Sequence, residues 1–215
     1  DNELLKGSDT ENGFEENDYK TERVWATSFD GTRIPISIIY KRSTKLNGTA
    51  PLFMQYEANF GETVELEFDP KLFSLLDRGF VCAIAHLRGG GYLGEKWHKE
   101  AIGLKKSKAI FDLIYSIRHL SNQDYSDKTK AFIYSINSNA TIVTSAINMT
   151  PNLFKGLILE NPKTDLITSL FLEKNDFKEH FSEWGDPHNE KNYFSLKAIS
   201  PSDQIRKNEF PNIYI

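Results

Sequence analysis

Short apolar runs with strand character alternate along this chain with segments of helical spacing. The pattern predicts strands at residues 21–29, 33–41, 50–57, 80–87, 130–135, 153–162 and 212–215. Helical spacing of apolar residues predicts helices at 69–79, 107–120 and 138–149. Asp30 and Gly31 indicate a hairpin turn between the first two strands. A hairpin followed by alternating strands and helices predicts an α/β domain, with a mostly parallel sheet and helices on both faces.

Composition narrows the class of protein and its partners. A chain of 215 residues suits one domain with a substantial core. The net charge of −4 and the pI near 5.8 argue against nucleic acid or anionic membranes as partners. The only cysteine, Cys82, excludes an internal disulfide. Residues 1–18 are too acidic for a signal peptide and no apolar run has transmembrane length, so we expect a soluble, cytoplasmic protein.

One strand–turn–helix segment has the pattern of a nucleophile elbow. Residues 130–149 read as an apolar strand, a sharp polar break and a helix, and serine hydrolases place G-x-S-x-G at such a turn. Here the turn carries Asn137. Asparagine tolerates positive φ better than most residues, so it suits the turn. Its carboxamide, however, cannot attack a carbonyl.

Four segments carry a family resemblance: residues 21–41, 74–98, 147–162 and 183–203. Together they closely resemble the catalytic domain of the prolyl oligopeptidase family, in its oligopeptidase B and prolyl endopeptidase-like branch. The resemblance implies an α/β-hydrolase fold, a β-propeller cap and a Ser, Asp, His triad. It divides the chain into a polar segment at 1–18, similar to the connection from the propeller, and a hydrolase domain at 19–215. We expect this domain to be truncated at its C-terminus, because the family's Asp and His follow the last predicted strand.

The departures from the family fall on the catalytic positions. Its elbow, G-G-S-A-G-G, matches residues 135–140 without gaps, which puts Asn137 at the position of the serine. Ser138 is then expected to offer its backbone N–H to an oxyanion hole and its side chain as a cap of the following helix. Only a one-residue shift would make Ser138 the nucleophile. Glu57 stands where the family has an oxyanion-binding tyrosine, and a carboxylate there would repel an oxyanion.

Substrate-binding positions have also changed. Relatives that prefer basic residues carry an acidic pair before an E-W-G motif, and this pair falls on His180 and Ser182, leaving Glu183 of the motif itself. Arg88 and Trp184 match the family and complete the candidate binding residues. No H-E-x-x-H motif or paired-ligand spacing occurs, so we expect neither a metal nor another cofactor.

Two functional hypotheses remain. The first is a pseudo-enzyme: an oligopeptidase B-like serine peptidase homologue that is catalytically inactive and binds short peptides if it binds any ligand. The second is a fragment of an active serine oligopeptidase that cleaves short peptides, with Ser138 as a shifted nucleophile. Under either hypothesis an exposed sheet edge offers a surface for association.

Overall fold

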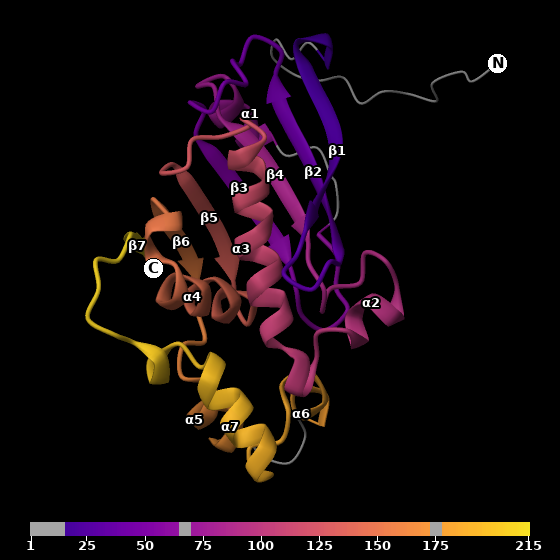
Figure 1. The fold of residues 1–215 in the computed structure, drawn as a ribbon, viewed down its shortest axis with the longest axis vertical. Coiled ribbons are helices and arrows are strands. Elements are labelled where there is room, and N and C mark those ends of the chain that lie inside the picture. The colour runs from indigo at the N-terminus through magenta and orange to yellow at the C-terminus, as the bar shows by residue number, and fades with distance from the viewer. Residues whose placement is uncertain (1–15, 65–69, 173–177) are drawn as a thin grey trace, which may run out of the picture.

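A mixed seven-stranded sheet forms the centre of the computed structural model, which describes residues 16–64, 70–172 and 178–215 (Figure 1). The predicted segment at 1–18 therefore lies largely outside the described residues. In sheet order the strands are β1 (Tyr19–Thr27), β2 (Arg33–Lys41), β4 (Val81–His86), β3 (Leu52–Glu57), β5 (Ala131–Ile136), β6 (Gly156–Glu160) and β7 (Asn212–Tyr214). β1, β2 and β4 pair antiparallel, and β4, β3, β5, β6 and β7 pair parallel. The structure thus confirms the predicted hairpin and the mostly parallel sheet.

Helices connect the parallel strands. They are α1 (Pro70–Leu76), α2 (Glu95–Lys99), α3 (Ser107–Asn122), α4 (Asn139–Met149), α5 (Leu166–Leu172), α6 (Lys178–Trp184) and α7 (Glu190–Ile199), with short 3-10 turns at Glu16–Asp18, Gly103–Lys105, Pro151–Leu153 and Ser202–Gln204. The sequence pattern predicted α1, α3 and α4 but missed the others. α2, α5 and α6 have five to seven residues, too few for a helical period to show. None of the helices in the described ranges is long and apolar enough to cross a membrane.

The main core lies between one face of the sheet and the helices α3 and α4. α3 packs on β1 and β2, whereas α4 packs on β5 and on α3 (Figure 1). The apolar stripe of α3 is fully buried at Ile110, Leu113 and Ile117. Strand residues that alternate toward the same side, such as Leu52 and Met54, are also fully buried. This layer fixes the carboxyl ends of β3 and β5, where the predicted catalytic positions lie.

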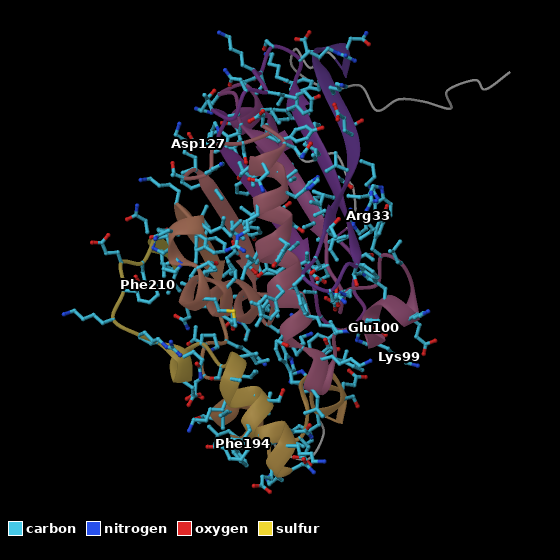
Figure 2. All side chains as sticks on the ribbon, in the orientation of Figure 1. Arg33, Lys99, Glu100, Asp127, Phe194 and Phe210 are labelled. Carbon is cyan, nitrogen blue, oxygen red and sulfur yellow. The ribbon has the colours of Figure 1, made fainter. Side chains whose placement is uncertain are left out.

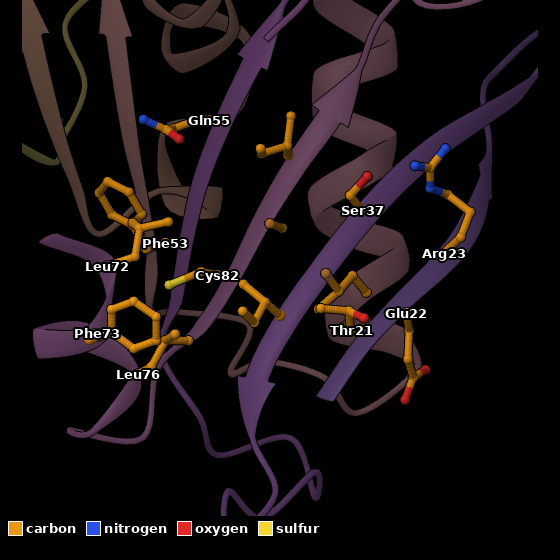
Figure 3. Close-up of a pocket in the computed structure, with 14 residues that line it drawn as sticks. Thr21, Glu22, Arg23, Ser37, Phe53, Gln55, Leu72, Phe73, Leu76 and Cys82 are labelled. Carbon is orange, nitrogen blue, oxygen red and sulfur yellow. The ribbon is translucent and has the colours of Figure 1, made fainter. Parts of the chain in front are cut away.

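The opposite face of the sheet carries α1 and a groove of about 480 Å³. Figure 3 shows Leu72 and Leu76 of α1 beside Phe53 and Cys82 of the sheet, with α3 on the far side. Phe53 belongs to the half-buried set of β3 that alternates with the buried core residues. The sheet therefore separates this groove from the core layer of α3 and α4, and no residue of the β5–α4 turn lines it.

Candidate active site

The turn between β5 and α4 has the backbone of a nucleophile elbow. Asn137 adopts φ 49°, between the last strand residue, Ile136, and the first helical residue, Asn139. Its backbone N donates to the carbonyl of Glu160 at 2.9 Å, and its carbonyl accepts from the N of Ala140 at 3.2 Å. Asn137 is thus the apex of the turn, as the ungapped match predicts, and it occupies the left-handed region that asparagine tolerates.

The side chain of Asn137 is held by a second asparagine. Its Oδ1 accepts a hydrogen bond from Nδ2 of Asn161 at 3.0 Å. Asn161 follows the end of β6 and also has a positive φ, 47°. A carboxamide at this apex can donate and accept hydrogen bonds, but it is not among the side chains that form covalent acyl intermediates.

Ser138 lies one residue beyond the apex and already has helical backbone angles, φ −66° and ψ −24°. Its hydroxyl makes no cap hydrogen bond to the helix, so the expected capping role is wrong. The physical reason is that a capping residue needs extended backbone angles to fold its side chain over the first turn. The Ser138 Oγ instead accepts from Nδ2 of Asn59, at 3.5 Å.

Glu57, at the position of the family's oxyanion tyrosine, is the last residue of β3 and contacts the start of α4 through Asn139. One carboxylate oxygen, Oε1, accepts from the backbone N of Ala58 at 3.0 Å and of Asn59 at 3.1 Å. The same oxygen accepts from Nδ2 of Asn139 at 2.6 Å. Partial burial nevertheless raises the pKa of the Glu57 carboxyl. The site therefore presents a hydrogen-bond acceptor where an oxyanion hole presents a donor.

Tyr56, the neighbour of Glu57, faces the opposite side of the sheet and is buried under α4. Its hydroxyl donates to the carbonyl of Asn139 at 2.6 Å. It accepts from Oγ of Ser135 at 3.0 Å and from the N of Val143 at 3.2 Å. Burial raises the pKa of this phenol. Tyr56 thus anchors α4 to β3 and does not replace the missing oxyanion donor.

The glycines at 89–91 bring their loop against the loop that follows Glu57. A Cβ on Gly89 would lie 2.1 Å from the carbonyl oxygen of Ala58, and one on Gly91 would lie 2.0 Å from that of Gly61. Such contacts are sterically forbidden, so only glycine permits this approach. The glycines of the R-G-G-G motif therefore allow this loop to lie directly against the backbone that follows β3.

Arg88 is not available to a ligand, contrary to the prediction. Its side chain is 1% exposed. Nε and Nη2 bind the carboxylate of Asp112 at 2.8 and 2.7 Å, and Nη1 binds Asp30 at 2.6 Å. Burial opposes the charge, but these two carboxylates raise the pKa of the guanidinium. Arg88 therefore ties the hairpin turn and α3 to the end of β4.

Glu183 and Trp184 are likewise internal. The Glu183 side chain is 2% exposed, and its Oε1 binds Nζ of Lys106, which is fully buried. The other oxygen, Oε2, lies 2.7 Å from Nε2 of His98. Nζ of Lys106 also donates to the carbonyl of Ala58 at 2.9 Å and lies 4.6 Å from the centre of the Trp184 ring. The E-W-G motif thus fixes α6 beside the Glu57 loop, and both side chains are buried in this arrangement.

Two buried charged residues were not identified from the sequence: Lys106, which immediately precedes α3, and Asp112, which lies on α3. One signal was present. Asp112 falls three residues after Ala109, within the apolar stripe of the helix at 107–120, where an ionised side chain needs a buried partner. Lys106 carries no such signal, because it precedes the stripe.

Two further predicted binding residues, His180 and Ser182, lie on α6. His180 lines a small cavity together with Ser138 of the elbow. The other lining residues are Thr141, Lys163, Leu166, Ser169, Leu170 and Trp184. Its volume is about 10 Å³, enough for one water molecule at most. The His180 ring packs against Phe60 at 5.3 Å, and Ser182 is exposed. Within the described ranges, no group of three His, Cys, Asp or Glu side chains could hold a metal ion.

Known proteins resemble this chain over nearly all of its length. Protease 2 of Moraxella lacunata is 29% identical over 94% of the chain, and the prolyl endopeptidase-like protein of Xenopus laevis is 29% identical over 92%. The solved structure of oligopeptidase B from Leishmania major superposes with a TM-score of 0.88, at 30% identity over 94% of the chain. The chain spans only 28–29% of the length of these relatives.

A match at the level of the whole family agrees with these pairwise similarities. The sequence profile of the prolyl oligopeptidase family matches residues 66–213. That range is well over half of the chain. This chain therefore belongs to the prolyl oligopeptidase family, with the α/β-hydrolase fold.

Proposed function

We propose that this chain is a peptidase homologue of the oligopeptidase B type that binds short peptides at its elbow without hydrolysing them. The observation that carries the proposal is Asn137 at the apex, with φ 49° and its carboxamide bonded to Asn161. The apex is where the fold exposes a nucleophile, and asparagine supplies none.

Glu57 supports the same conclusion independently. An oxyanion-hole donor contributes about 2.7–4 kcal/mol to transition-state stabilisation. Glu57 replaces that donor with an acceptor that already takes three N–H groups of the protein. A developing oxyanion at this place would be repelled by the Glu57 carboxylate. The transition state would therefore be destabilised even if a nucleophile were supplied at the apex.

A shifted nucleophile at Ser138 is the competing function. One observation favours it, because Ser138 and His180 line the same cavity. Two observations oppose it: Ser138 has helical backbone angles, and the cavity has a volume of about 10 Å³. A peptide does not fit into a cavity of this size.

Hydrolysis of fluorogenic peptides tests the proposal. The purified chain is incubated with Arg-, Lys- and Pro-containing substrates and, separately, with a serine-directed phosphonate, beside an active family member as positive control. We expect no turnover and no covalent labelling, for the wild type and for Ser138→Ala alike. Turnover that both the phosphonate and Ser138→Ala abolish would refute the proposal and establish Ser138 as the nucleophile.

A further inference from the structure

The Glu57 carboxylate is bound to the protein through one oxygen only. Oε1 takes the three hydrogen bonds from Ala58, Asn59 and Asn139. Oε2 takes no hydrogen bond or ion pair from any residue that the structure describes. Glu57 is half-buried, so this oxygen is an oriented acceptor that a molecule from solvent can reach.

Glu57 forms no ion pair with any residue in the described ranges. The buried Lys106 interacts electrostatically with Glu57, but its Nζ forms its ion pair with Glu183. Glu62 is close enough to act on Glu57 as a like charge. On the same loop, Oδ1 of the fully buried Asn59 has no hydrogen-bond partner within the described part of the chain. The loop thus combines a carboxylate oxygen that has no hydrogen-bond or ion-pair partner, Oε2 of Glu57, with a second acceptor that lacks a donor.

We propose that this site binds a primary ammonium group, held end-on at Oε2 of Glu57. The inference rests on the proposed function, since it names the ligand chemistry of an elbow that binds without hydrolysis. A compact ammonium is favoured over a guanidinium because the planar fork of a guanidinium binds both oxygens of a carboxylate. Here Oε1 already accepts three hydrogen bonds, so only a single-point contact remains.

Small probes that share the same butyl group test, on the full chain, whether the site prefers a primary ammonium. Butylammonium, butylguanidinium and butanol are titrated at low ionic strength, and binding is followed by calorimetry or ligand-observed NMR. We expect saturable binding of butylammonium, at least about tenfold weaker binding of butanol, and no advantage for butylguanidinium, since a charged hydrogen bond typically contributes that factor or more. Equal binding of butanol, tenfold tighter binding of butylguanidinium, or no saturable binding of butylammonium would each overturn the proposal.

Variants locate the site. Glu57→Gln keeps the shape of the side chain and an acceptor for the three N–H donors but removes the charge, so the preference for butylammonium over butanol should disappear. Glu62→Gln removes an equal charge from an exposed neighbour and should keep the preference. A preference that survives Glu57→Gln would refute the assignment. If Glu57→Gln fails to fold, the three probes on the wild-type chain still decide. Peptide turnover, by contrast, would refute the proposed function and is measured separately.

Discussion

Replacement of Lys106 by methionine tests whether the buried charges behind the site act as a unit. The ammonium is fully buried and binds Glu183 and the carbonyl of Ala58, over the ring of Trp184. Methionine fills a similar volume without charge. The substitution therefore leaves Glu183, 2% exposed, as a buried carboxylate with His98 as its remaining partner.

The expected loss of stability is large. Removing one partner of a buried ion pair costs about 3–5 kcal/mol, because the remaining charge keeps its desolvation penalty and loses its counter-ion. The carbonyl of Ala58 also loses its donor. We therefore expect the free energy of unfolding to fall by about 4 kcal/mol, a large fraction of the 5–15 kcal/mol typical of a domain.

Urea unfolding followed by tryptophan fluorescence measures this loss. The matched control is Lys99→Met, since Lys99 extends from α2 at the surface and pairs with the exposed Glu95 (Figure 2). The control should change stability little, because many surface ion pairs contribute nothing measurable. The double variant Lys106→Met, Glu183→Leu should recover much of the loss. A loss below about 1 kcal/mol for Lys106→Met, or a double variant as unstable as the sum of both single ones, would refute this reasoning.

Two other predictions concern the strands beside the site. Burial, together with the charge of Arg23, lowers the pKa of His86 from 6.5 to about 4, so the unfolded chain gains a proton before the native one does as the pH falls. Stability should fall by about 3 kcal/mol between about pH 6.5 and pH 4, at about 1.36 kcal/mol per pKa unit, and His86→Gln should flatten this dependence in urea unfolding. Tyr56→Phe should lower the free energy of unfolding by about 2 kcal/mol, because three buried groups lose their partner. Tyr134→Phe, on the half-buried side of β5, should have a much smaller effect, and equal losses for the two tyrosines would contradict the hydrogen-bond argument.

The sheet and the elbow were predictable from the sequence for physical reasons. Buried parallel strands need continuous apolar runs, and these runs located β3, β4, β5 and β6. The place of Asn137 followed from an ungapped match across both β5 and α4, in which a one-residue shift would have moved every side chain of the strand to the other face.

The internal roles of Arg88 and Glu183 were not predictable in this way. Family motifs show that a residue type is retained, but they do not distinguish a ligand-binding charge from one that is buried in the fold. Glu183 and Lys106 are 77 positions apart in the sequence, so their pairing exists only after α6 packs on the start of α3. Tertiary contacts of this kind leave no local pattern in the sequence.

Two residues that differ from the family pattern, Glu57 and Asn139, are hydrogen-bonded to each other in the site. In the family elbow, position 139 is a glycine, which has no side chain to reach β3. Here the amide of Asn139 donates to Glu57 and accepts from both Asn59 and the N of Ala58. A carboxylate at position 57 needs such donors, since partial burial disfavours its charge. A serine restored at Asn137 would therefore still face an acceptor that its neighbours hold in place, so under the proposed function Asn137→Ser alone should not restore hydrolysis.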